Sequence, residues 1–372
     1  MQLTRSLHIN TERTWRGGEK QTLLLVTGLL RRGHVAELAC PPGSAIEERA
    51  RAEGVTVHAI RMRGELDPRA IWRLRGLMRD GAYQICQMHT SHAHSLGVLA
   101  RALKPLGRAG WPRTVVARRV DFSIHRRGMM RLNAIKYRYG VDHYIAISQA
   151  IRNVMIKDGI APERITVVYS GVDELPPAET DRAGIRARHG IPLNAILIGN
   201  IAHLAGHKGH RVLVGAIAAL RSRWPNLHVL IVGEGREREA IEGEIARAEL
   251  GARIHLAGFQ RDVRAYLQSF DVFTMPSLEE GLCTSILDAL REELPVVASE
   301  TGGIPEIVRP GDTGWLARPG DAADLAGKLS ECVGDLVAAR AFGRRGRNMV
   351  LGEFSSDRTV EGTLKVYERL LS

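Results

Sequence analysis

Cysteine, aromatic residues and long apolar runs are all scarce in this chain of 372 residues. The sequence holds four cysteines, and they are scattered: Cys40, Cys86, Cys283 and Cys332. This spacing indicates neither a disulfide framework nor a zinc site. Aromatic residues make up 5% of the chain and are not interleaved with its basic residues. That scarcity argues against a nucleic-acid partner, which needs rings for base stacking.

The longest apolar run extends from Leu23 to Leu30, and Thr27 and Gly28 interrupt it. It is much shorter than the roughly 20 residues that cross a bilayer as a helix. The acidic residues Glu12 and Glu19 precede it, which is untypical of a signal peptide. We therefore expect a cytoplasmic protein.

Length and alternation predict two α/β domains. The chain has room for two domains of about 150–190 residues, and 44% of its residues are hydrophobic. Short apolar segments alternate with amphipathic ones, which favours βαβ units and parallel sheets. A Pro176-Pro177 pair interrupts this alternation and is the best candidate linker. We predict doubly wound domains over 1–175 and 176–355, with a final helix over 356–372.

The strands are expected near 6–10, 35–40, 55–60, 84–89, 114–119, 143–148 and 165–170, and again near 195–201, 228–233, 253–258, 271–275 and 295–299. Helices are expected between the strands and throughout the C-terminal end. Ser148 is the expected N-cap of a helix over Gln149–Lys157, and a further helix is expected to open at Pro305.

Charge is unevenly distributed. Residues 1–175 contain 28 Lys and Arg against 15 Asp and Glu, giving +13, whereas residues 176–372 contain 24 and 26, giving −2. A basic first half suggests an anionic partner there, such as a phosphorylated acceptor, an anionic membrane surface or nucleic acid. A generally arginine-rich composition is an equally good explanation.

The segment 276–306, PSLEEGLCTSILDALREELPVVASETGGIPE, is the most informative. Glu280 lies on a loop after an expected strand, and Asp288 lies one turn inside the helix that should begin at Thr284. Open parallel sheets bind ligands at the carboxyl ends of their strands, and the N-terminus of a helix binds phosphate. Carboxylates nearby accept hydrogen bonds from hydroxyl groups. The pattern therefore indicates a sugar nucleotide.

This segment resembles the signature of the family-4 retaining glycosyltransferases, which have the GT-B fold. Glu280-Gly281 and the run Gly302 to Glu306 match the family pattern. Asp288 stands where the second glutamate is usual, and Cys283 stands where glycine is common. The resemblance implies two Rossmann-like domains facing a central cleft, with the final helix crossing back to the first domain.

The resemblance also implies roles for individual residues. The catalytic set is His89, Lys208 and Glu280; the donor-binding set is Gly17, Gly18, Asn200, His207, Gly233, Gly258, Phe259, Arg261, Gly281, Thr284 and Asp288; and the acceptor-side set is Arg118, Arg119, Arg126 and Lys136. Glu280 is assigned to sugar hydroxyls and Asp288 to the ribose. Asn200 stands where many members carry arginine, so His207 is a candidate for the missing cation.

Two other chemistries fit less well. Gly233 and Gly235 lack the third glycine of a nicotinamide fingerprint, because position 238 is arginine. His89, His92 and His94 are close in sequence, but no cysteine or carboxylate accompanies them as a metal site would require. The chain also has no Asp-x-Asp motif. We therefore expect neither a metal nor a cofactor.

The implied function is metal-independent, retaining transfer of a sugar from a UDP- or GDP-sugar. The acceptor would be a cell-envelope glycan or glycolipid, such as a lipopolysaccharide core or a lipid-linked glycan. Lys208 and helix amides would stabilise the departing diphosphate, whose oxygen takes the acceptor's proton.

The basic first half would recruit an anionic acceptor or the inner face of the cytoplasmic membrane. A few of Arg118, Arg119, Arg126 and Arg127 would suffice for reversible docking. The alternatives are a GT-B-fold epimerase or phosphorylase, although no pyridoxal lysine motif is evident, and a non-catalytic basic binder of membrane or polyanion.

Overall fold

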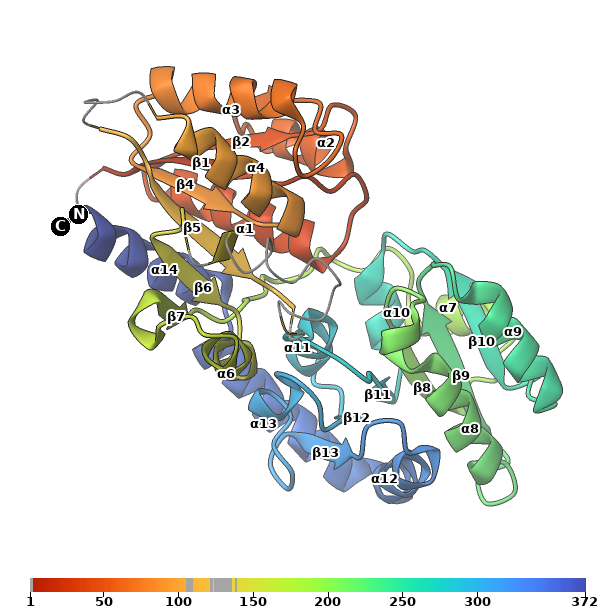
Figure 1. Cartoon of the computed structure of the whole chain (residues 1–372). Coiled ribbons are helices and arrows are strands. Elements are labelled where there is room, and N and C mark those ends of the chain that lie inside the picture. The colour runs from red at the N-terminus through yellow and green to blue at the C-terminus, as the bar shows by residue number, and fades with distance from the viewer. Residues whose placement is uncertain (1–2, 105–109, 121–122, 124–135, 138) are drawn as a thin grey trace. The chain divides into compact units, whose positions relative to one another are not determined.

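The computed structural model describes residues 3–104, 110–120, 123, 136–137 and 139–372. The chain divides into two compact units, each built around its own parallel sheet (Figure 1). The first unit contains Met1–Gly171 together with Ser356–Ser372, and the second contains Val172–Ser355. The C-terminal helix thus groups with the first unit.

The first unit has a seven-stranded sheet in the order β3-β2-β1-β4-β5-β6-β7. Its strands are β1 Arg5–Ile9, β2 Val35–Cys40, β3 Val57–Ala59, β4 Ile85–Met88, β5 Arg113–Arg118, β6 His143–Ala146 and β7 Ile165–Val167. Every pairing is parallel. The central strands are buried on both faces, as parallel strands between helix layers should be. The strand order reverses between β1 and β4, which makes their carboxyl ends the expected ligand site.

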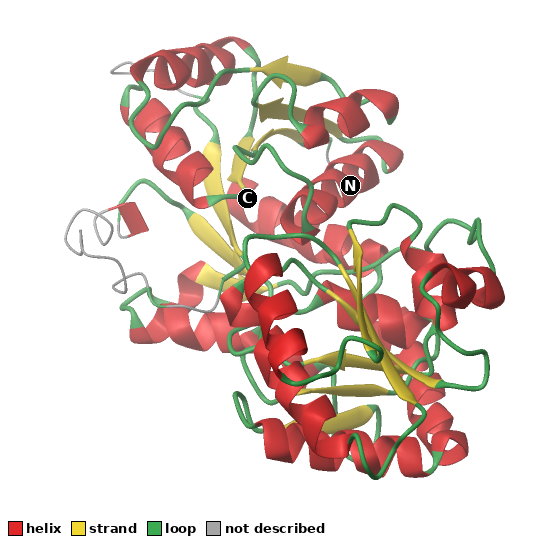
Figure 2. Ribbon diagram, turned by 90° about the vertical axis from the view of Figure 1, so that its right-hand side faces the viewer, coloured by secondary structure: helices red, strands yellow, loops and turns green. Residues whose placement is uncertain are grey.

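Helices cover both faces of this sheet (Figure 2). They are α1 Gly17–Arg31, α2 Ala45–Ala52, α3 Pro68–Asp80, α4 Ser91–Ala102, α6 Gln149–Lys157, the 3₁₀ turn η1 Pro162–Arg164 and α14 Ser356–Leu371. Ser148 caps α6 through its hydroxyl, as the sequence predicted. A Cβ at Gly28 of α1 would lie 2.5 Å from Val360 Cγ2, so glycine lets α14 pack closely on α1. Tyr367 of α14 also donates a hydrogen bond to Gln87.

The second unit has a six-stranded sheet in the order β10-β9-β8-β11-β12-β13. Its strands are β8 Ile196–Ile201, β9 Leu227–Val232, β10 Ile254–Gly258, β11 Val272–Met275, β12 Val296–Ser299 and β13 Gly314–Ala317. The prediction of two doubly wound α/β domains is therefore confirmed. The prediction that helices fill the whole C-terminal end is wrong, because β13 pairs with β12 at the sheet edge. Only its two terminal residues are buried, so β13 lacks the continuous buried run of the central strands.

The helices of the second unit are α7 Arg182–Arg188, η2 Gly206–Lys208, α8 His210–Leu220, α9 Arg238–Arg247, α10 Val263–Ser269, α11 Thr284–Arg291, η3 Ile304–Glu306, α12 Ala322–Gly334 and α13 Leu336–Glu353. The helix expected at Pro305 is a single 3₁₀ turn, η3. Among the described residues, no helix is both long enough and apolar enough to cross a membrane.

Candidate functional site

Lys208 and Glu280 form an ion pair where the strand order of the second sheet reverses. Lys208 ends η2 in the loop after β8, and Glu280 lies in the loop after β11. The Lys208 ammonium donates to the Glu280 carboxylate, and the two side chains are 16% and 11% exposed. The sequence placed both residues at the donor site, and the structure shows that they contact each other.

A glycine lets these two loops approach each other closely. Gly209 has φ +69°, and a Cβ there would lie 1.9 Å from the Pro276 carbonyl oxygen. A side chain at position 209 would therefore push the two loops apart. The Leu278 amide also donates to the His207 carbonyl at 2.7 Å, which fixes the register of the loops.

The Glu280 loop is held on its other side by the glycine-rich turn. The Gly303 amide donates to the Glu280 carbonyl at 3.2 Å, and the Ser277 hydroxyl donates to the Glu280 carboxylate at 3.3 Å. Gly281 follows as a buried residue. These contacts fix Glu280 beside the start of α11, where helix amides have no partner within the helix.

Helix α11 begins at Thr284, as predicted, with Cys283 as its N-cap residue. Asp288 lies in the second turn and is almost fully buried. The Cys283 thiol contacts the Ser285 hydroxyl at 3.2 Å, and burial raises its pKa to about 12. Cys283 is thus an inert buried residue at neutral pH, while the N-terminus of α11 suits a phosphate.

Asn200 does not take the place of the missing arginine. Its side chain is fully buried in β8. Its amide nitrogen lies 2.8 Å from the Thr274 carbonyl and 3.9 Å from Met275 Sδ, so both hydrogens already have acceptors. His207 is a poor cation as well, because burial, and then the Lys208 charge, lowers its pKa.

Gly233 and Gly235 serve close backbone packing. A Cβ at Gly233 would lie 1.9 Å from the Ala202 carbonyl oxygen, and one at Gly235 would lie 2.2 Å from the Leu204 carbonyl oxygen. The Gly233 amide donates to the Gly258 carbonyl at 2.9 Å. The glycine turn therefore packs directly against the loop after β8. This packing by itself explains why both positions are glycine.

Phe259 and Arg261 follow Gly258 at the carboxyl end of β10 and are exposed. They lie at the same edge of the sheet as Lys208, because the carboxyl ends of parallel strands meet at one edge. The exposed Phe259 ring can contact a bound base.

In the first unit, Arg119 lies at the start of α1. A Cβ at Gly18 would be 3.8 Å from Arg119 Cδ, so the arginine stem passes beside the Gly17-Gly18 pair. Arg119 donates to Ser170 Oγ at 3.3 Å and forms no salt bridge with any described residue. Burial lowers its pKa to about 10, an effect that nearby Glu19 partly opposes. An arginine in such surroundings is well placed to take an anion.

His89 is held by His8, a residue that the sequence motifs did not indicate. His8 Nδ1 and His89 Nε2 are 3.0 Å apart, and the Ser6 hydroxyl lies 3.0 Å from His8 Nε2. The two rings stack with centroids 5.3 Å apart. Burial lowers the pKa of His8 to about 3 and that of His89 well below its ordinary value, so both rings are neutral. The sequence did contain a signal for this contact. His8 and His89 lie near the carboxyl ends of two strands that the doubly wound order makes neighbours.

Two of the acceptor-side residues are engaged within the first unit. Arg118 is 7% exposed and donates to the Tyr137 hydroxyl at 2.6 Å. The prediction that Arg118 belongs to a docking surface is therefore wrong, because its charge is buried against a ring. Lys136 pairs with Glu65 at 3.3 Å. Arg126 and Arg127 lie outside the described residues.

The remaining histidines of this region do not gather a metal site. The His94 ring packs edge-on against Tyr137, and its Nε2 lies 3.2 Å from the Lys136 carbonyl oxygen. His92 lies 3.7 Å from Glu65. Within the ranges described, no three His, Cys, Asp or Glu residues are arranged to hold a metal ion.

Solved structures with this fold are glycosyltransferases of the GT-B class. HepE of Anabaena, in complex with UDP and glucose, has a TM-score of 0.85 at 19% identity, over 98% of this chain and all of that one. The lipopolysaccharide outer core galactosyltransferase WaaB has a TM-score of 0.70 at 15% identity, over 99% of this chain and all of that one. At these identities the likeness concerns the fold.

Two family models identify the chain more closely. Residues 15–174 match the model for Glycosyltransferase Family 4, and residues 193–335 match Glycosyl transferases group 1. The chain belongs to the family-4 (group 1) glycosyltransferases.

Curated relatives agree with this membership. One is 2-deoxystreptamine glucosyltransferase of Streptomyces kanamyceticus, 33% identical over 57% of this chain and 56% of the relative. Another is the amylovoran biosynthesis glycosyltransferase AmsK of Erwinia amylovora, 30% identical over 70% and 65%. A third, the Bacillus subtilis protein EpsD, a putative glycosyltransferase, is matched over 50% of its length. The chain thus spans between about half and two thirds of these relatives.

Proposed function

We propose that this protein transfers a sugar, with retention of configuration, from a nucleotide-diphosphate donor to a cell-envelope glycan or glycolipid. The observation that carries the proposal is the Lys208–Glu280 pair beside the N-terminus of α11. A cation and helix amides suit a diphosphate, and a carboxylate suits sugar hydroxyls. The complex of HepE with UDP and glucose supports a UDP-sugar as the donor.

Donor binding requires an exchange of partners. Lys208 turns from Glu280 to the diphosphate, and the released carboxylate accepts hydrogen bonds from the sugar. Asp288, one turn into α11, accepts from the ribose hydroxyls. The Glu280 carboxylate thereby exchanges one charged partner, Lys208, for hydroxyl donors of the sugar, so it is not left unpaired.

In the chemical step, the bond between the anomeric carbon and the diphosphate oxygen breaks as the bond to the acceptor oxygen forms on the same face. The acceptor's proton passes to the departing phosphate oxygen. Lys208 and the α11 amides stabilise the charge that develops on the diphosphate. On this proposal Glu280 and Asp288 position the donor and neither acts as a nucleophile.

Arg119 supplies a further cation in the proposed function. It lies beside the N-terminal amides of α1 at Gly17-Gly18 and pairs with no described carboxylate. It therefore binds a phosphate group of a substrate, whereas Asn200, which stands where the family commonly has arginine, has no hydrogen left to donate. His89, neutral and fixed by His8, contacts the donor sugar.

A thermal-shift screen of nucleotide sugars against the full chain tests the assignment. We expect one UDP- or GDP-sugar to raise the melting temperature and to be hydrolysed slowly without an acceptor. NMR of the released sugar then reports the anomeric configuration. A C2 epimer as the product would instead support an epimerase, and no response to any donor would support a non-catalytic binder.

A further inference from the structure

The outward side of α3 is rich in arginine and has little acid to balance it. Ala70, Leu74 and Met78 pack into the unit, which leaves Arg69, Trp72 and Arg73 exposed. The α3 face is defined here as the exposed residues of α3 and the loop before it: Arg61, Arg63, Leu66, Arg69, Trp72 and Arg73. None of them belongs to the sites proposed above.

The acids near the α3 face are occupied. The Asp67 carboxylate caps α3, accepting from the amides of Arg69 and Ala70. Asp80 is held by Arg79 at 2.7 and 2.8 Å, and Glu65 pairs with Lys136. Among the described residues, no carboxylate pairs with Arg61, Arg69 or Arg73. The face therefore presents a net positive charge.

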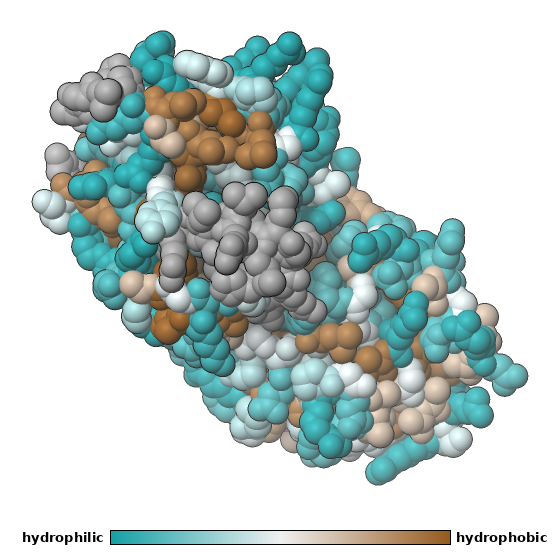
Figure 3. Space-filling view, in the orientation of Figure 1, coloured by the Kyte–Doolittle hydropathy of each residue, from teal (hydrophilic) through white to brown (hydrophobic). Residues whose placement is uncertain are grey.

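Large apolar side chains stand among these arginines. Leu66 is 75% exposed and Trp72 is 59% exposed. The Arg75 guanidinium lies 5.0 Å from the Trp72 ring centroid and donates to the Leu103 carbonyl at 2.9 Å, so the ring has a fixed neighbour. Figure 3 shows hydrophobic surface next to hydrophilic side chains in the region of α3 and α4. Trp and Leu beside basic residues are typical of protein surfaces that lie in a membrane interface.

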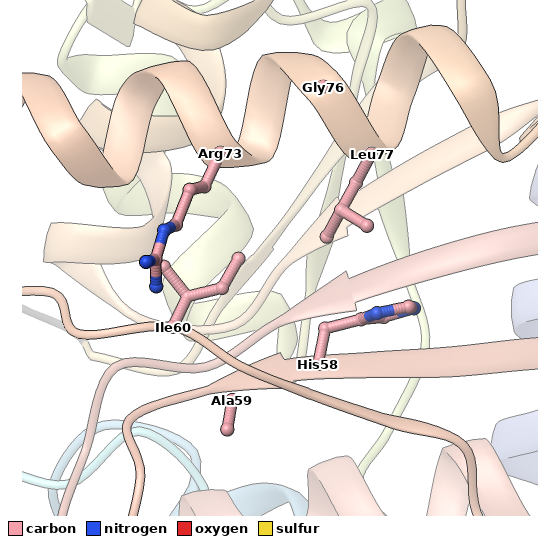
Figure 4. A pocket seen from close by; sticks show the side chains of 6 residues that line it. All are labelled: His58, Ala59, Ile60, Arg73, Gly76 and Leu77. Carbon is pink, nitrogen blue, oxygen red and sulfur yellow. The ribbon is translucent and has the colours of Figure 1, made fainter.

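A groove continues the face along the sheet edge. It has a volume of about 410 Å³ and is lined by His58, Ala59, Ile60, Arg73, Gly76 and Leu77. Figure 4 shows Arg73 and Leu77 projecting from α3 toward Ile60 and the edge strand β3. A guanidinium beside an apolar lining suits an amphiphile, which has an anionic head and an alkyl chain. A polyanion such as nucleic acid would leave the apolar lining exposed.

We propose that the α3 face docks this protein on an anionic phospholipid bilayer. Arg61, Arg69 and Arg73 contact lipid phosphates, and Trp72 and Leu66 enter the interface. The face takes the role that the sequence gave to the Arg118 run. The inference rests on the proposed function in one respect: docking would bring the enzyme to a lipid-linked acceptor.

Co-sedimentation of the full chain with vesicles tests the proposal. We expect binding to phosphatidylcholine vesicles that contain phosphatidylglycerol, and little binding to phosphatidylcholine alone. Replacing Arg61, Arg69 and Arg73 together by Gln should weaken binding by about fivefold for each arginine. Trp72→Ala should weaken it further at high salt, where charge attraction is screened.

A matched control removes the same charge elsewhere in the first unit: Arg13→Gln, Lys157→Gln and Lys365→Gln, all at exposed positions. It should bind vesicles like the parent chain. Equal binding by the two triple variants would overturn the proposal, as would equal binding to neutral and anionic vesicles. A third outcome would also overturn it: an oligonucleotide binds the protein and loses affinity in the Arg61, Arg69 and Arg73 variant, while Trp72→Ala leaves vesicle binding unchanged. Donor hydrolysis is measured in parallel; it should be unchanged, so failed docking is distinguishable from failed transferase activity.

Discussion

The Lys208 ammonium and the Glu280 carboxylate neutralise each other through a direct hydrogen bond at the carboxyl ends of β8 and β11. The resemblance gave these residues separate duties, one toward the diphosphate and one toward the sugar. Because they are partners in the free protein, each substitution changes the charge that the other presents. Their variants should therefore respond differently to a nucleotide and to a nucleotide sugar.

Lys208→Ala should lower the affinity for UDP by about tenfold to a hundredfold, because a charge-assisted hydrogen bond contributes about 1.5–3 kcal/mol. Isothermal calorimetry measures this directly. Arg211→Ala is the matched control, since Arg211 is an exposed cation on the adjoining helix α8. Unchanged UDP affinity in Lys208→Ala would remove Lys208 from the donor site.

Glu280→Gln should bind UDP at least as tightly as the parent chain, because the amide no longer holds the Lys208 charge. Transfer from the sugar nucleotide should nevertheless fall by about tenfold to a hundredfold, because a neutral amide is a weaker acceptor than a carboxylate. Calorimetry with UDP and a donor turnover assay together test the pair of effects. A parallel loss in both would mean that Glu280 acts mainly by supporting the fold.

The alternation of strands and helices was sufficient to predict both doubly wound sheets, and Ser148 was sufficient to predict the start of α6. The predictions failed where contacts across elements decide. Arg118 and Arg119 are neighbours in one basic run, yet successive residues leaving a strand point to opposite faces. One meets the Tyr137 ring and the other meets Gly18. Sequence spacing cannot show which face is already filled.

The Lys208–Glu280 pair shows the same limit within the candidate site. Both residues could be named from the family pattern. Their contact depends on the close approach of two loops that are distant in sequence, and this approach is possible because position 209 is glycine. His8 differs, because its contact with His89 follows from β1 and β4 being neighbours, which the doubly wound order already implies.

Buried histidines should make the protein less stable in acid. The pKa values of His8 and His94 are about 3 in the folded chain because burial disfavours the charged ring, whereas an unfolded histidine titrates near 6.5. The unfolded state therefore takes up protons that the folded state cannot. The contribution of these histidines to the free energy of unfolding is fully present above about pH 6.5. At lower pH the free energy of unfolding decreases by up to about 1.4 kcal/mol per pH unit for each such histidine.

His94→Gln should reduce this pH slope by about 1.3 kcal/mol per unit, measured by urea unfolding between about pH 6 and pH 4. The slope is the readout, because lost packing against Tyr137 shifts the whole curve without changing proton uptake. A slope equal to that of the parent chain would show that His94 is protonated in the folded protein as well.

Arg119→Met should weaken the binding of phosphate-bearing ligands without unfolding the protein. A half-buried arginine that has only a hydroxyl partner among the described residues contributes little to folding, because its desolvation opposes its single hydrogen bond. Methionine keeps much of the side-chain volume beside Gly18. The melting temperature of the free protein should therefore stay the same or rise, while the increase caused by UDP or pyrophosphate shrinks. Affinity should fall by about tenfold to a hundredfold.

Arg13→Met is the matched control for this experiment. Arg13 is exposed in the loop before α1 and carries the same charge, so a general change in electrostatic potential would affect both variants alike. If only the Arg119 variant loses the response to UDP, Arg119 binds the donor. If UDP binding is unchanged but inorganic phosphate no longer stabilises the protein, the phosphate belongs to the acceptor. A large drop in the melting temperature of the free Arg119 variant, with normal responses to both ligands, would instead show that the arginine serves only the fold.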